Sequence, residues 1–265
     1  MMLRQSLGHL HSVDPNYASG YGDYQKWHWW FQGREQVLRK LLHTHLSVRR
    51  SRRIASLGCG PGEGLTWLLE FAGPAGKVFG CDVHPSQGCG SDVEIVGGTL
   101  ESLPFASAIF DVVLLLDVLE HLDDDISALT EAARVLKPDG VLLVTVPAME
   151  SLWGGQDLVS HHRRRYSLRD LRELFRRSRL PRAKISYFNT ILFPPVAAVR
   201  WTRALLGRAN RPRTDFEDNH PGFMNNVLAA VFGFERYLVG RVPMPFGVSL
   251  LALVSPSVNT QQNRE

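Results

Sequence analysis

The sequence predicts an α/β fold built on a mostly parallel, doubly wound sheet. Short apolar runs alternate with helical patterns through the middle of the chain, a glycine-rich turn follows the first run, and an aspartate ends the second. Such alternation predicts parallel strands joined by crossover helices. With 265 residues, of which 44% are hydrophobic and 21% charged, the chain has the composition of a globular protein with a sizeable core.

The strands are predicted from short apolar runs bounded by polar or turn residues. The run "DVVLLL" is apolar almost throughout, as buried parallel strands tend to be. Seven segments are strand-like: 53–57, 77–82, 93–96, 111–116, 141–147, 183–188 and 248–255.

Helices are predicted where apolar residues recur at helical spacing. Ser167 is a plausible cap for an amphipathic helix at 167–178, and "KPDG" at 137–140 predicts a turn after the preceding helix. The four core helices are expected at 35–46, 64–72, 125–136 and 167–178.

Nearly sixty residues separate the last two predicted strands. Two helical patterns, at 195–207 and 225–240, occupy this stretch, and a structureless loop of such length would be unusual. We therefore expect a helical insertion before the last strand. The predicted organisation is an N-terminal aromatic cap at 1–33, a core at 34–188, the insertion at 189–246, the final strand at 247–256 and a tail at 257–265.

The segment "RIASLGCGPGEG" has glycine at every second position from Gly58 to Gly64. Glycine permits positive φ and the close approach of a ligand to the backbone. The dinucleotide fingerprint fits in no register, and no Lys-Ser or Lys-Thr pair completes a phosphate-binding P-loop. Both observations disfavour a phosphate ligand, and with it a nicotinamide dehydrogenase.

Asp82 ends the second predicted strand about twenty residues after the glycine loop, where an acidic side chain can accept hydrogen bonds from both ribose hydroxyls. The combination favours a nucleoside whose tail runs beside the glycine turn without a phosphate. S-adenosylmethionine is such a ligand.

Five motifs, in order, carry a resemblance to a known family: "ASLGCGPGEG", "VFGCDVH", "GTLESLPF", "FDVVLLLDVLEHLDD" and "ARVLKPDGVLLVTVP". Together they resemble class I S-adenosylmethionine-dependent methyltransferases, in the small-molecule (type 11-like) branch that includes quinone-biosynthesis enzymes. The resemblance covers 34–188. It implies a Rossmann-like, seven-stranded sheet with an antiparallel last strand and S-adenosylmethionine as cofactor.

The resemblance also implies roles for individual residues. The glycine-loop residues would pass under the methionine part of the cofactor, Asp82 would bind the ribose, and Asp117 would lie near the methyl group. The expected cofactor-binding residues are Gly58, Cys59, Gly60, Gly62, Asp82, Val83, Thr99, Leu100 and Asp117. Ser56 and Thr99 stand where the family often has acidic residues, which keeps a non-catalytic binding protein open as an alternative.

Methyl transfer requires close alignment and, for a hydroxyl acceptor, a base that removes the proton. Asp117 and His121 follow the fourth strand, and His162 follows the fifth, so all three are candidate catalytic residues. His162 is the preferred base, because it lies in a long loop and histidine has a suitable pKa. A capping or packing role is the alternative for each histidine.

Substrate contacts are expected from two segments. Arg164, Arg165 and Tyr166 could bind an anionic group, and Trp30, within "WHWWF", could form a lid over an apolar acceptor. Packing of these aromatic rings into the core is the alternative. A second resemblance, of "WHWWFQGRE" and "LWGGQDLVSHHRRRYSLRDL", is to a bacterial subgroup connected with glycan, lipid or secondary-metabolite assembly.

These observations predict methyl transfer to a small-molecule, glycan- or lipid-linked acceptor, at oxygen. The net charge is +4, but 163–184 holds ten basic residues, which makes an RNA or protein methyltransferase the alternative enzyme. Base-modifying enzymes usually carry an Asn-Pro-Pro-aromatic or Asp-Pro-Pro-aromatic motif where this chain reads "LDVLEH", so no nucleic-acid partner is expected.

Cys81, His84 and Cys89, with Cys59 as a further candidate, are possible zinc ligands. Only Cys81 and His84 have typical ligand spacing, and Cys59 is explained by the glycine loop, so no metal is expected. Three distant cysteines and the lack of an apolar N-terminal run favour a cytoplasmic protein. The arginine-bearing insertion could rest on the inner face of a membrane or cover a lipid-linked substrate.

Overall fold

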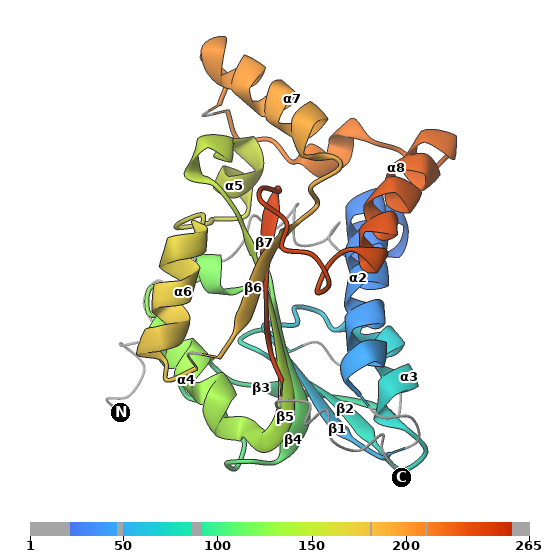
Figure 1. Cartoon of the computed structure of the whole chain (residues 1–265), viewed down its shortest axis with the longest axis vertical. Helices are drawn as coiled ribbons and strands as arrows, with labels where there is room; N and C mark the ends of the chain where they lie inside the picture. Colours follow the sequence, from blue (N-terminus) through green and yellow to red (C-terminus); the bar gives the residue numbers. More distant parts are fainter. Residues whose placement is uncertain (1–21, 47–49, 86–91, 181, 210, 256–265) are drawn as a thin grey trace, which may run out of the picture.

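The computed structural model describes residues 22–46, 50–85, 92–180, 182–209 and 211–255. They form a seven-stranded sheet in the order β3-β2-β1-β4-β5-β7-β6 (Figure 1). Strands β1 to β5 are parallel where they pair, and β7 is antiparallel to both neighbours, β5 and β6. The predicted mostly parallel sheet with an antiparallel last strand is confirmed.

All seven predicted strands are present, with small changes at their ends. They are β1 (Arg53–Leu57), β2 (Lys77–Asp82), β3 (Val93–Gly97), β4 (Phe110–Leu116), β5 (Leu136–Pro147), β6 (Lys184–Phe188) and β7 (Ser249–Val254). The predicted turn at 137–140 is wrong as a separate element, because these residues belong to β5. Phe110 pairs with Leu136 but Val112 pairs with Val141, so "KPDG" bulges out of the ladder between them.

Helices cover both faces of the sheet (Figure 1). On one face lie α4 (Asp125–Val135) and α6 (Leu168–Arg177), and on the other lie α2 (Trp29–His45), α3 (Leu69–Ala72) and α8 (Phe223–Phe234). Each layer buries its own core, around Leu129 and Phe175 on the first face and around Leu38 and Phe232 on the second. The helix expected at 64–72 is instead η1, a 3-10 segment (Glu63–Leu68), followed by the short α3.

Caps and short helices complete the layers. Ser167 caps α6 as predicted, and it forms a capping box with Asp170. Short elements follow β4 and β5: η2 (Leu119–His121), η3 (Glu150–Leu152) and α5 (Gly155–Val159). The described insertion holds α7 (Phe193–Leu205), η4 (Asp215–Asp218), α8 and η5 (Glu235–Tyr237).

The N-terminal cap is not a separate unit. Its predicted boundary between residues 33 and 34 falls inside α2, which is one continuous helix. Gly33 lies so close to Phe232 of α8 that a Cβ atom there would be 2.4 Å from the phenyl ring. The start of α2 and the insertion are therefore packed together on the same face of the core.

Candidate active site

A cleft of about 1590 Å³ lies at the carboxyl ends of β1, β2, β4 and β5. This is where ligands gather in open α/β sheets. Twelve predicted site residues line it: Trp30, Gly58, Cys59, Gly60, Asp82, Val83, Thr99, Leu100, Asp117, His121, His162 and Arg165. Gly62, Arg164 and Tyr166 are not among its lining residues.

The glycine loop needs its glycines for two different reasons. Gly58, Gly60 and Gly62 have φ of 70°, 58° and 80°, a region that side chains disfavour. A Cβ on Gly58 would lie 2.6 Å from Val118, so this glycine permits close packing. A Cβ on Gly60 would meet no atom within 4 Å, so Gly60 leaves its backbone open to a ligand in the cleft.

Asp82 is held beside this loop. Its Oδ2 accepts a hydrogen bond from the Gly60 backbone nitrogen at 2.7 Å, and its Oδ1 accepts one from the His84 backbone nitrogen at 3.0 Å. Each carboxylate oxygen can accept more than one hydrogen bond, so both can also accept from a vicinal diol. An open glycine backbone next to an oriented carboxylate fits a nucleoside cofactor such as S-adenosylmethionine.

Asp117, at the other side of the cleft, is paired with a residue that no sequence motif indicated. Arg34 of α2 forms an ion pair with its Oδ2, and the Thr145 hydroxyl donates to the same oxygen at 2.9 Å. The Arg34 guanidinium also lies 4.5 Å from the centre of the Trp30 ring. Asp117 thus anchors α2 and Trp30 over the cleft, and its Oδ2 is already bound by two donors.

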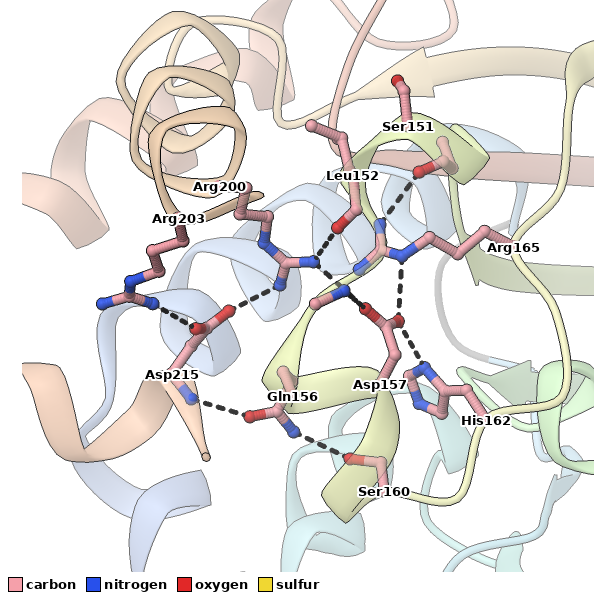
Figure 2. Close-up of polar contacts among 12 residues, drawn as sticks. Ser151, Leu152, Gln156, Asp157, Ser160, His162, Arg165, Arg200, Arg203 and Asp215 are labelled. Carbon is pink, nitrogen blue, oxygen red and sulfur yellow. Dashed lines mark hydrogen bonds and ion pairs between the residues drawn. The ribbon is translucent and has the colours of Figure 1, made fainter. Parts of the chain in front are cut away.

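His162 is oriented by a second acidic residue (Figure 2). Its Nδ1 lies 2.8 Å from Oδ1 of Asp157, which leaves Nε2 facing Glu120, 3.9 Å away. The imidazole ring stacks edge-on against His121, with 4.7 Å between ring centres. A carboxylate that fixes one ring nitrogen leaves the other to act as base or ligand.

Asp157 is the centre of a buried polar network (Figure 2). It accepts hydrogen bonds from the Gly154 backbone at 2.8 Å, from Arg165 at 2.8 Å and from Arg200 at 3.3 Å. Burial by itself would raise the pKa of Asp157, but the His162 hydrogen bond and both arginine charges outweigh it and hold the pKa below its usual range. Asp157 is therefore a buried anion that interacts with Arg165, Arg200 and His162 at once.

The same network ties the insertion to the active-site loop. Arg200 of α7 donates to Oδ2 of Asp215 at 2.5 Å, and Arg203 donates to Oδ1 at 3.2 Å. The Asp215 backbone donates to Gln156 at 2.9 Å. Figure 2 shows these contacts joining α7 and η4 to the loop that carries His162.

Glu120 and His121 lie in η2, next to the loop that carries His162; the Arg163 backbone of this loop donates to the Glu120 carbonyl at 2.8 Å. Glu120 is completely buried, and burial together with the negative charge of Asp117 raises its pKa well above the ordinary value. Burial, then the neighbouring His162, lowers the pKa of His121 to about 3. A neutral histidine with that pKa is a weak base, so His121 is poorly suited to the predicted role of proton acceptor.

Three predicted substrate contacts need correction. Tyr166 is 3% exposed and its hydroxyl donates to Asp125 at 2.8 Å, while Arg164 binds the same carboxylate at 3.2 Å. Both side chains thus fasten the loop to α4 instead of facing an acceptor. Arg165 does border the cleft, but its guanidinium is used by Asp157 and by the Ala148 carbonyl.

The cysteine-based metal site gains no support from the described residues. Cys81 is buried, and burial and Asp82 raise the pKa of its thiol to about 11. Among the described residues, the one cluster of three possible metal ligands contains neither Cys81 nor His84. His84 lies exposed at the end of β2, and Cys89 falls outside the described residues.

Comparison with known proteins agrees with this geometry. Residues 55–144 match the methyltransferase domain family. The chain contains a class I methyltransferase domain. It is 32% identical over 153 residues to a "probable S-adenosylmethionine-dependent methyltransferase" of Mycolicibacterium smegmatis, over 55% of this chain and 57% of that protein.

A second relative is the ubiquinone/menaquinone biosynthesis C-methyltransferase UbiE of Klebsiella pneumoniae, 32% identical over 43% of this chain and 51% of that protein. The chain thus spans little more than half the length of either relative. A chain of the solved "Complex between the Haloferax volcanii Trm112 methyltransferase activator and the putative methyltransferase" has a similar fold. Its TM-score is 0.56 and its identity 22%, with coverage of 92% of this chain and 98% of that one. The family match at 55–144 lies within 34–188, the segment that carries the five motifs.

Sequence reasoning missed Arg34, Asp157 and Arg200. Arg34 and its partner Asp117 are 83 positions apart, and Arg200 and Asp157 are 43 positions apart. No local pattern marks such pairs, because they meet only once the helices are placed over the sheet.

Proposed function

We propose that the chain is an S-adenosylmethionine-dependent methyltransferase that methylates an oxygen atom of a small-molecule, glycan- or lipid-linked acceptor. The observation that carries the proposal is the open backbone at Gly60 beside the oriented Asp82 carboxylate. Bound S-adenosylmethionine would supply an electrophilic methyl group on its sulfonium.

The cofactor's ribose would lie against Asp82, its adenine beside Val83, Thr99 and Leu100, and its methionine part over the glycine loop. All of these positions line one cleft. On the opposite side, Asp157 holds His162 in one orientation, so that Nε2 could take a proton from an acceptor hydroxyl. Trp30, fixed over the cleft by Arg34, would cover the acceptor.

Specific observations support two alternatives to this proposal, and another argues against a third. Carbon is the alternative acceptor atom, since the Klebsiella pneumoniae relative is named as a C-methyltransferase. Binding without catalysis is the alternative to an enzyme, because Ser56 and Thr99 line the cleft without an acidic side chain. An RNA or protein acceptor is less favoured, because Arg164 and Arg165 of the basic segment are used in internal contacts.

The proposed function is tested by calorimetric titration of the purified chain with S-adenosylhomocysteine and, separately, with NAD. We expect micromolar binding of the first ligand and no binding of NAD. Incubation with methyl-labelled S-adenosylmethionine and fractionated small molecules or lipids should then label a product. Binding of NAD alone would overturn the proposal, and cofactor binding without any labelled product would favour the non-catalytic alternative.

We also propose that the insertion rests on an anionic membrane surface. Among the described residues, no helix is long and apolar enough to cross a membrane. The insertion nevertheless exposes large apolar side chains, with Leu205 88%, Phe223 82% and Leu206 62% accessible. Such exposure on α7 and α8 is typical of a binding surface, and exposed Arg208 and Arg241 would favour anionic lipid.

Co-sedimentation with phosphatidylglycerol vesicles checks the membrane proposal. The unmodified chain is expected to sediment with them and to remain in solution with phosphatidylcholine vesicles. The double variant Leu205→Gln and Phe223→Gln should lose most of the binding, because two of the most exposed apolar groups are removed. Equal sedimentation of both proteins would contradict the proposal.

A further inference from the structure

We propose that Glu120, His121 and His162 form a binding site for a divalent transition-metal ion at the acceptor side of the cleft. Each of these residues offers one ligand atom, and the three atoms lie within 4.8 Å of one another. All three residues line the cleft. One carboxylate with two imidazoles is a donor set of zinc and iron(II) sites that leave coordination positions open.

The first independent observation is the state of Glu120. Its side chain is 0% exposed, and neither carboxylate oxygen has a hydrogen-bond partner within the part of the chain that the structure describes. A buried carboxylate without a partner is costly, so each such group in a folded protein requires an explanation. A cation bound between Glu120 and the two histidines would provide the missing partner.

The second observation is that His162 is held in place by other groups. Its Nδ1 lies 2.8 Å from Oδ1 of Asp157, and its ring packs edge-on against His121 with 4.7 Å between ring centres. Histidine ligands of metals usually donate their second ring nitrogen to a carboxylate or a backbone carbonyl in this way. Asp157 is itself fixed by Arg165 and Arg200, so the position of His162 is set in advance.

The donor set also indicates the class of ion. Imidazole ligands suit zinc, iron, cobalt and nickel, whereas magnesium and calcium prefer sites made only of oxygen. We therefore expect zinc and cobalt to bind, and magnesium to bind weakly. The proposed site departs from the expectation of no metal, and it shares no residue with the set Cys81, His84 and Cys89 considered from the sequence.

One consequence rests on the proposed function. An ion at this site would bind the acceptor's hydroxyl and lower the pKa of that hydroxyl, so that its proton leaves to water. The oxygen lone pair would then attack the methyl carbon, and the electrons of the broken carbon–sulfur bond would remain on sulfur. His162 would act as a ligand in place of the base, and the preferred acceptor would carry a second oxygen next to the first to fill an open coordination position.

Metal binding is tested directly, without cofactor or acceptor. The chain is stripped with chelator and titrated calorimetrically with zinc, cobalt and magnesium, and the visible spectrum of the cobalt form is recorded. We expect one zinc per chain and a cobalt spectrum of low coordination number. Glu120→Gln and His162→Asn should each weaken zinc binding by at least about 100-fold, since loss of an outer partner alone typically costs 10–100-fold.

His43→Asn is the matched control. His43 also lies beside a carboxylate, with its Nε2 2.8 Å from Glu70, but on the exposed surface and outside the cluster. This variant should leave the zinc affinity unchanged. Melting curves establish that Glu120→Gln and His162→Asn are folded, and either variant alone suffices if the other is not.

Absence of saturable zinc and cobalt binding, or binding that both cluster variants leave unchanged, would overturn the inference. Because S-adenosylhomocysteine binding is measured on the metal-free chain, its failure would reject the proposed function without touching the metal site. If the chain still methylates its acceptor after the metal is removed with chelator, His162 would act as the base and no metal would be needed for the reaction.

Discussion

Replacement of Asp82 by alanine is expected to weaken the binding of S-adenosylhomocysteine by about 100-fold or more. The bound ligand would lose the two hydrogen bonds that its ribose hydroxyls donate to the Asp82 carboxylate. Hydrogen bonds to a charged group contribute about 1.5–3 kcal/mol each. The substitution also removes the acceptor of the Gly60 and His84 backbone nitrogens, so the glycine loop would lose part of its fixed shape. Calorimetric titration measures the change.

Two further variants make this result specific. Asp82→Asn keeps the shape and one acceptor oxygen, so its loss should be smaller, at about 10-fold. Asp139→Ala removes an exposed carboxylate whose ion pair with Arg50 spans 3.8 Å, and it should bind like the unmodified chain. Unchanged affinity in Asp82→Ala would mean that the cleft holds its ligand by other groups, and the proposed ribose contact would be rejected.

Asp157→Ala is expected to lower the free energy of unfolding by about 3–5 kcal/mol, because removal of one partner of a buried ion pair leaves uncompensated charge. Asp157 is 0% exposed, and Arg165 and Arg200, which both bind it, are largely buried. The loss is large against a typical total stability of about 5–15 kcal/mol. Urea unfolding at neutral pH measures it.

The contacts of Asp157 also predict how much stability different substitutions would lose. Asp157→Asn keeps the volume and an acceptor for the Gly154 backbone, so it should be destabilised less than the alanine variant. Asp139→Ala again serves as control, with an expected change near zero for an exposed pair. A loss below about 1 kcal/mol in Asp157→Ala would show that the two arginines find other partners, and the network would not be what holds α7 to the active-site loop.

The cofactor half of the site could be predicted from the sequence because it depends on local geometry. Gly58 and Gly60 adopt positive φ within a few residues of β1, and Asp82 is the last residue of β2. Parallel pairing of these two strands brings the loop and the carboxylate together whatever the rest of the chain does. The positions of the glycines and of Asp82 at the ends of the first two strands therefore sufficed to predict the cofactor half of the site.

The acceptor half could be predicted only in outline. His162 was identified by residue type, whereas its partner Asp157 was not, and Arg164 and Tyr166 were assigned to an acceptor although both bind Asp125. A run of basic residues in a loop does not reveal which of them turn inward. The direction of each side chain depends on which acidic groups the neighbouring helix presents to the loop.

The sequence by itself determined the sheet, the glycine loop and the acidic residue at the second strand, because apolar periodicity and backbone geometry act over a few residues. The tertiary structure decided the remainder: Arg34 reaches Asp117 only when α2 lies over the cleft, and Arg200 reaches Asp157 only when α7 lies beside α5. The convergence of Glu120, His121 and His162 belongs to this second group. Charge pairing and burial between distant segments act through space, and no short pattern in the chain encodes them.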